Sequence, residues 1–375
     1  MPRLYVSVCL FVVCFIHLAA AQQNRNEELI KKNLAQHEYE LSSDGKNFLS
    51  NAARNASFFL LGELHGENEI PELLHQLWPV MWRDGYRYIA GELSPWAANR
   101  MEFATPDQQP KLMTLWTQPE VSFVHSFGGS RPVLWGCDME EFQTQLLIRD
   151  LATANPQNPT LREMQEIVKS GYKRNMAHDL LALSRSLSGI HDPSVNGIPL
   201  LKNIQSTLEI DEYRLNPDTK FSAQLRRESL MKELFLEHYH QNISPQSQEK
   251  IMLRFGRNHL HRGYDVRGIS TLGNFIAEFA FAQHKTVFNV AAFGAGGKAS
   301  LAGETWDADE RNDDLAFALF ASSARYSATV FDLQPLRQLL HRIPAEERSP
   351  EQQRLAFWAD SYDAIICYKD VTPRN

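Results

Sequence analysis

Residues 58–75 read FFLLGELHGENEIPELLH, an apolar run that ends in a cluster of acidic residues around one histidine. Residues 58–61 are all large and apolar, which is typical of a strand buried on both faces of a parallel sheet. Glu63 and His65 come directly after the glycine that follows this run, and Pro71 suits the first turn of a helix. The stretch therefore predicts a buried strand, a polar turn and a helix.

The same order of strand and helix continues along the chain. Apolar runs bounded by glycine or acidic residues predict about seven strands, at 57–64, 86–93, 131–138, 250–256, 286–294, 326–333 and 362–370. Residues 140–248 instead place apolar side chains at the helical spacing of three and four. We expect an α/β fold with a parallel-rich (mixed) central sheet of about seven strands flanked by helices. A large helical insertion at about 145–245 caps the carboxyl ends of the strands.

The N-terminus has the composition of a secretory signal peptide. Arg3 precedes a continuous apolar run that ends in three alanines at 19–21. A short basic end, an apolar centre and small residues at the cleavage site mark such a signal, and the run is shorter than a membrane span requires. We expect residues 1–21 to be removed. Residues 22–375 then form a single-domain protein that is exported to the periplasm or secreted, without stable membrane insertion.

Charge and cysteine content narrow the class of protein further. The formal net charge is −7 and the chain has no cluster of Lys and Arg, so we expect a small-molecule substrate and no nucleic-acid partner. After removal of the signal only Cys137 and Cys367 remain, too few for a disulfide framework. Both lie in apolar strand-like segments and favour buried core positions, with a single disulfide as the alternative.

Polar residues gather where the predicted strands end. Glu63 and His65 follow the first strand, Glu92 ends the second, and His259 lies just after the fourth. Ligands of open parallel sheets bind in the crevice outside the carboxyl ends of the strands, so we expect these side chains in one pocket. A strand-end carboxylate can also cap a helix or pair with an arginine, and Asp138 after the third strand favours such a cap.

The pairing of Glu63 with His65 suits acid–base chemistry. The two residues share a face in extended chain, and a carboxylate beside an imidazole fixes its tautomer and raises its basicity. His259, together with Arg262, would bind a carbonyl oxygen as negative charge develops. In a metal-dependent alternative, His65, Glu92 and His259 hold a divalent ion such as zinc or manganese.

Other polar residues favour structural roles. His75 lies beside the apolar stripe of the predicted helix. The stretch GAGGKAS at 294–300 departs from a P-loop because Ala292 and Ala299 stand where the pattern needs glycine and Ser/Thr. The chain contains neither G-x-S-x-G nor H-E-x-x-H. The absence of these motifs disfavours a serine hydrolase and a zincin metalloprotease.

These motifs resemble the erythromycin-esterase-like superfamily, which also includes Tiki-type proteases and ChaN-like haem-uptake lipoproteins. The resemblance begins at about residue 56 and runs to the C-terminus. It is carried by GELHG, by a second Gly-Glu, by VLWGCD, RRESLMKELF and KIMLRFGRNHLHRG, and by the closing YDAIICYKDVTP.

The resemblance implies that Glu63, His65, Glu92 and His259 form the polar core of the site, with His65 as general base on water. One residue separates Glu63 from His65, as in the haem-uptake branch, whereas the esterases usually have two. Residues 257–259 read Arg-Asn-His in place of the esterases' His-Asn-x-His.

We therefore expect an exported hydrolase of an ester, lactone or amide bond, with or without a divalent metal. The alternative is a protein that binds haem or another small apolar ligand, with Tyr264 or His261 as the axial haem ligand. Two strand-end glutamates are costly to desolvate in a protein that only binds an apolar ligand, which favours the hydrolase.

Overall fold

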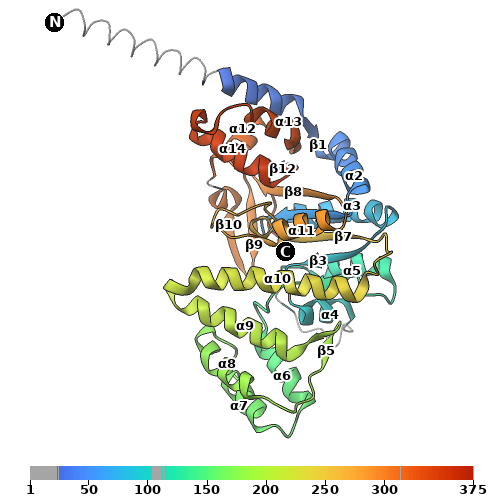
Figure 1. The fold of residues 1–375 in the computed structure, drawn as a ribbon, viewed down its shortest axis with the longest axis vertical. Helices are drawn as coiled ribbons and strands as arrows, with labels where there is room; N and C mark the ends of the chain where they lie inside the picture. Colours follow the sequence, from blue (N-terminus) through green and yellow to red (C-terminus); the bar gives the residue numbers. More distant parts are fainter. Residues whose placement is uncertain (1–22, 24, 104–111, 113–114, 313, 375) are drawn as a thin grey trace, which may run out of the picture.

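The computed structural model describes residues 23, 25–103, 112, 115–312 and 314–374, so the expected signal peptide lies outside the described residues. The strands of its central sheet are β1 (Glu38–Glu40), β2 (Phe58–Glu63), β3 (Tyr86–Gly91), β4 (Leu134–Gly136), β7 (Lys250–Gly256), β8 (Val287–Gly294), β11 (Ala328–Asp332) and β12 (Ala364–Tyr368). They lie in the order β1-β11-β12-β8-β2-β7-β3-β4 (Figure 1). The six strands from β12 to β4 are parallel, and β11 and β1 extend one edge as antiparallel pairs. The expected α/β fold with a mixed sheet is confirmed.

The quoted strand β2 lies inside the sheet, between β8 and β7. Its side chains alternate between two hydrophobic cores, one on each face of the sheet. Phe59 and Leu61 belong to one core, and Phe58 and Leu60 belong to the other. Each of these four residues is at most 1% exposed. The unbroken apolar run is therefore explained by burial on both faces.

Helices cover both faces of the sheet. One core contains residues of α2 (Lys46–Asn55), α3 (Glu69–Arg83), α4 (Pro95–Phe103) and α5 (Gln118–Gly128). The opposite core contains residues of an N-terminal helix over 25–36 and of α11 (Leu272–Ala282), α12 (Leu315–Ser323), α13 (Leu333–Leu340) and α14 (Pro350–Ser361). None of the helices in the described part of the chain is long and apolar enough to cross a membrane.

The chain between β4 and β7 forms the expected helical insertion. It consists of α6 (Thr144–Ala154), α7 (Pro159–Ile167), α8 (Ala177–Ser186), α9 (Leu200–Leu215) and α10 (Lys220–Asn242). In Figure 1 the long helix α10 lies between the sheet and the other helices of the insertion. Leu230 and Phe235 of α10 belong to the core that contains Phe58 and Leu60. The insertion is therefore packed directly against the sheet.

Several short strands were not expected from the sequence. Residues 38–40 form β1 at the edge of the sheet, and two antiparallel pairs lie outside it. These are β5 (Ser194–Val195) with β6 (Ile198–Pro199), and β9 (Lys298–Leu301) with β10 (Glu304–Asp307). Strands this short carry too little alternation to be recognised. Cys137 and Cys367 are both buried and do not form a disulfide with each other, in agreement with core positions.

Candidate functional site

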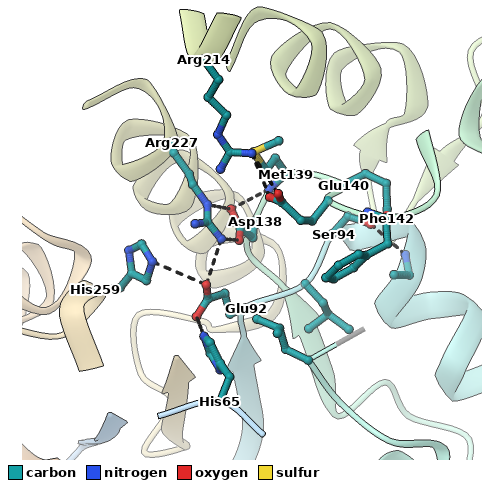
Figure 2. Close-up of a pocket in the computed structure, with 14 residues that line it drawn as sticks. His65, Glu92, Ser94, Asp138, Met139, Glu140, Phe142, Arg214, Arg227 and His259 are labelled. Carbon is teal, nitrogen blue, oxygen red and sulfur yellow. Dashed lines mark hydrogen bonds and ion pairs between the residues drawn. The ribbon is translucent and has the colours of Figure 1, made fainter. Parts of the chain in front are cut away.

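A pocket of about 260 Å³ opens where β2, β3, β4 and β7 end. Figure 2 shows that His65, Arg227 and His259 point toward one carboxylate, that of Glu92. The side chains that line the pocket are His65, Glu92, Leu93, Ser94, Ala97, Leu115, Asp138, Met139, Glu140, Glu141, Phe142, Arg214, Arg227 and His259.

His65 lies between two carboxylates. Its Nδ1–H donates a hydrogen bond to Oε1 of Glu63 at 2.9 Å, and its Nε2 lies 3.4 Å from Oε2 of Glu92. Glu63 is the last residue of β2, and Glu92 directly follows β3, so the strand ends hold both carboxylates in place. The side chain of His65 is 23% exposed, whereas the two glutamate side chains are each 4% exposed. The imidazole is thus the most accessible of the three groups.

The two carboxylates control the charge of this imidazole. Burial alone would lower the pKa of His65, but the charge of Glu92 and the hydrogen bonds to Glu63 and Glu92 raise this pKa to about 9. Burial would raise the pKa of Glu63, but the nearby Arg254 and the hydrogen bond from His65 lower it to about 2. At neutral pH the site therefore holds an imidazolium between two carboxylates.

His259 repeats this arrangement on the other oxygen of Glu92. Its Nδ1–H donates to Oε1 of Glu228 at 2.5 Å, and its Nε2 lies 3.5 Å from Oε1 of Glu92. His259 ends a single 3₁₀ turn that follows β7, and Glu228 lies on α10. The second oxygen of Glu228 accepts the backbone N–H of Leu272 at 2.9 Å. The insertion therefore fixes the second imidazole through Glu228.

Gly256 at the end of β7 allows the close approach of these groups. Its backbone N–H donates to Oε2 of Glu92 at 2.6 Å. A Cβ atom at this position would lie 2.9 Å from Nε2 of His65 and 3.2 Å from Oε2 of Glu92. Any side chain at residue 256 would thus push His65 away from Glu92, which explains the glycine at this strand end.

Arg227 of α10 adds a cation to the same carboxylate. Its Nη2 donates to Oε1 of Glu92 at 2.9 Å and to Oδ2 of Asp138 at 2.5 Å, and its Nε donates to Oδ1 of Asp138 at 3.0 Å. Burial would raise the pKa of Glu92, but the two histidines and Arg227 lower it well below its usual value. At Asp138 burial prevails over the pairing with Arg227 and raises the pKa. Glu92 is therefore ionised at neutral pH.

The rest of the pocket lining combines two further acidic groups with apolar side chains. The hydroxyl of Ser94 donates to Oε2 of Glu140 at 2.5 Å. Arg214 of α9 donates to Oε1 of Glu141 at 3.0 Å. The apolar lining consists of Leu93, Ala97, Leu115, Met139 and Phe142. A ligand in this pocket therefore meets both charged and apolar side chains.

The structure brings four of the expected site residues together, and these are Glu63, His65, Glu92 and His259. Arg262 is not among them. Its guanidinium forms an ion pair with Asp363, and its backbone N–H donates to the carbonyl of Ser361 at 3.4 Å. The expected place of Arg262 in the site is therefore wrong, because these contacts hold it beside the segment that joins α14 to β12.

The two residues considered as axial haem ligands do not line the pocket either. Tyr264 is 66% exposed. His261 is fully buried, with Nδ1 3.1 Å from the hydroxyl of Ser361. The rings within about 5 Å of the imidazole are Phe357, Trp358 and Tyr362. His75 also lies outside the pocket and stacks on Phe123 at 3.9 Å between ring centroids, as expected for a structural residue.

Three charged residues of the site were not predicted from the sequence. Arg227 and Glu228 come from the insertion, more than 130 residues after Glu92, and only their place in RRESLMKELF gave a signal. Arg254 lies within β7, where it is 1% exposed and donates to Glu63 at 2.6 Å. A lone arginine in an apolar strand is a recognisable signal, because a buried guanidinium requires carboxylate partners.

The donor set does not fit the metal ion that we considered. The Nε2 atoms of His65 and His259 are both directed at Glu92, and the guanidinium of Arg227 lies 2.9 Å from Oε1 of Glu92. A cation placed between these groups would meet that guanidinium at short range. Within the described residues no group of three or more His, Cys, Asp or Glu could hold a metal ion. Arg227 thus occupies the place of a cation.

Solved structures of other proteins resemble this fold over most of the chain. No protein-family model matches the chain, and no curated protein matches it. Among solved structures, a Bacillus cereus protein matches with a TM-score of 0.60 and 13% identity over 92% of this chain and 98% of that chain. A succinoglycan biosynthesis protein matches with a TM-score of 0.57 and 12% identity over 92% of this chain and 97% of that chain. A mutant of the erythromycin esterase EreC, in its open conformation, matches with a TM-score of 0.58 and 13% identity over 88% of this chain and 95% of that chain. The chain therefore has an erythromycin-esterase-like fold.

Proposed function

We propose that the protein is a hydrolase of an ester, lactone or amide bond in a small molecule, with His65 as general base. The observation that supports this most strongly is the setting of His65. Its Nδ1 is held by Glu63, its Nε2 lies 3.4 Å from the pocket-lining Glu92, and its side chain is 23% exposed and lines the pocket. An imidazole that is oriented by a carboxylate and partly exposed in a pocket is suited to accept a proton from water.

The reaction follows from this geometry. Neutral His65 takes a proton from water at Nε2, and the resulting hydroxide adds to the carbonyl carbon. His259 and the cationic Arg227, both in the pocket lining, stabilise the negative charge that forms on the carbonyl oxygen. The C–O or C–N bond then breaks, and the leaving group takes the proton back from His65. Arg227 here takes the role that we had expected for Arg262.

The low pKa of Glu63 and Glu92 supports this assignment. Both carboxylates stay ionised at neutral pH, so they stabilise the imidazolium that forms when His65 accepts the proton. Because the pKa of His65 is about 9, the neutral base becomes the dominant form only above that pH.

We also propose export through residues 1–21. N-terminal sequencing of exported protein is then expected to begin at Gln22.

A substrate panel tests the hydrolase. Purified protein is incubated with chromogenic esters, lactones and anilides at alkaline pH, and His65→Gln is compared with His75→Ala. Removal of a general base lowers turnover by about 10²- to 10⁴-fold, so we expect this loss in His65→Gln alone. Equal turnover by the His65→Gln variant would refute the mechanism. A visible haem spectrum that survives dialysis, without turnover of any substrate, would favour the ligand-binding alternative.

A further inference from the structure

The chain after β12 runs along the loop that carries His65. The backbone N–H of Asn68 donates to the carbonyl of Thr372 at 3.0 Å, and the N–H of Arg374 donates to the carbonyl of Gly66 at 2.9 Å. Between these two bonds, Glu67 and Pro373 form an isolated antiparallel bridge. Residues 372–374 are therefore paired with the backbone that begins directly after His65.

The side chain of Arg374 contacts two further segments beside the pocket. Its Nη1 donates to the carbonyl of Leu115 at 2.6 Å, and Leu115 is part of the pocket wall. Its Nη2 forms an ion pair with Oε2 of Glu120 on α5. The side chain of Arg374 is only 6% exposed and that of Glu120 only 1%. A desolvated pair of this kind holds its geometry closely, because either charge alone would be costly.

Glu120 connects Arg374 with the proposed base. Its other carboxylate oxygen accepts Nη1 of Arg254 at 2.5 Å. Arg254 in turn donates from Nε to Oε2 of Glu63 at 2.6 Å, and Glu63 holds Nδ1 of His65. The contacts thus form an unbroken series of alternating charges in the order Arg374, Glu120, Arg254, Glu63 and His65.

We propose that Arg374 is a positioning residue of the hydrolase site, which orients the Glu63–His65 pair through Glu120 and Arg254. This inference rests on the proposed function. Arg374 acts from two directions, since its backbone fixes Gly66 next to the base and its guanidinium fixes one end of the charge series. Loss of the guanidinium leaves Glu120 with one guanidinium partner, Arg254, so that the hold of Arg254 on Glu63 is altered.

The experiment compares Arg374→Met and Arg374→Lys with Arg325→Met. Arg325 serves as control, because its more exposed side chain also pairs with a buried carboxylate, that of Glu38, and neither arginine lines the pocket. For Arg374→Met we expect kcat to fall by about tenfold or more with KM nearly unchanged, as when a group acts mainly in the transition state. Arg374→Lys restores part of the rate, and Arg325→Met leaves kcat unchanged at temperatures where each variant is folded. An unchanged kcat in Arg374→Met would overturn the proposal.

A second measurement does not depend on a substrate. NMR titration of the His65 imidazole is expected to show a shifted midpoint in Arg374→Met and a midpoint nearer to the wild type in Arg374→Lys. A shifted His65 midpoint in a protein that hydrolyses no substrate would support the positioning role and reject the hydrolase. If the His65 titration is the same in all three proteins, Arg374 has only a structural role.

Discussion

The imidazoles of His65 and His259 lie against the two different oxygens of one carboxylate. Nε2 of His65 is 3.4 Å from Oε2 of Glu92, and Nε2 of His259 is 3.5 Å from Oε1. Each ring is held at its other nitrogen by a carboxylate of its own, Glu63 for His65 and Glu228 for His259. A change in the charge of Glu92 is therefore felt by both histidines.

The first prediction concerns the pH dependence of turnover. The free protein has a pKa of about 9 at His65, and only the neutral imidazole accepts a proton. We expect kcat/KM to rise about tenfold per pH unit below this pKa and to level off above it. The raised pKa of His65 also stabilises the folded state. This contribution to the free energy of unfolding is fully present below pH 6.5, the pKa of His65 in the unfolded chain, and is lost as the pH rises through about 9. Rates are therefore measured together with unfolding at each pH. A rate that falls as the pH approaches 9 contradicts the role of His65 as base.

The second prediction concerns Glu92→Gln. The charge of Glu92 is the largest of the interactions that raise the pKa of His65. Without it we expect the rise of kcat/KM to move to lower pH, while the maximal rate decreases because the imidazolium is stabilised less. The measurement is the pH–rate profile beside an NMR titration of His65. Glu72→Gln on an exposed part of α3 serves as control, and an unmoved profile in Glu92→Gln would count against the electrostatic account.

The third prediction separates Arg227 from Arg262. Arg227→Met removes the guanidinium that pairs with the buried carboxylates of Glu92 and Asp138. Breaking such a pair costs roughly 3–5 kcal/mol of unfolding free energy, and we expect a strong loss of turnover as well. Arg262→Met removes an ion pair to Asp363 outside the pocket, with a loss of about 1 kcal/mol and normal turnover. Chemical denaturation and kinetics on both variants check this, and the reverse order of effects would exclude Arg227 from the mechanism.

The fourth prediction concerns Glu67, a carboxyl that is 1% exposed. Burial raises its pKa to about 8, although the backbone N–H of Gly294 donates to it at 3.0 Å. Between pH 4.5 and about 8 the folded state holds a proton that the unfolded state has released, so this group makes stability fall as the pH rises. Glu67→Gln keeps the acceptor for Gly294 and is expected to stabilise the fold by roughly 2–4 kcal/mol at alkaline pH. Denaturation at acidic and alkaline pH measures the gain, and an equal effect at both contradicts the assignment.

Much of the fold and part of the site could be predicted from the sequence. The strand ends at Glu63 and Glu92 were recognisable, because a parallel strand buried on both faces is an unbroken apolar run and the polar residue after it is conspicuous. The carboxyl ends of parallel strands meet at one edge of the sheet, and this rule predicts that His65 and His259 lie in the same pocket.

The remaining site residues depend on packing that no local pattern encodes. Arg227 and Glu228 reach the pocket only because α10 lies against the sheet, and helical periodicity alone does not tell which face of a helix meets which strand end. Arg262 was misplaced for the same reason. It follows His259 by three residues, but the 3₁₀ turn and the contacts with Ser361 and Asp363 direct it away from the pocket.

The position of β2 between β7 and β8 has a consequence for the synthesis of the chain. Glu63 and its partner Arg254 on β7 are 191 residues apart in the sequence, and β8 comes later still. An apolar strand with two unpaired edges therefore leaves the ribosome long before either neighbour exists. Such non-local pairing slows folding and exposes strands to aggregation. We expect newly made chains to depend on chaperones until β7 and β8 have been synthesised.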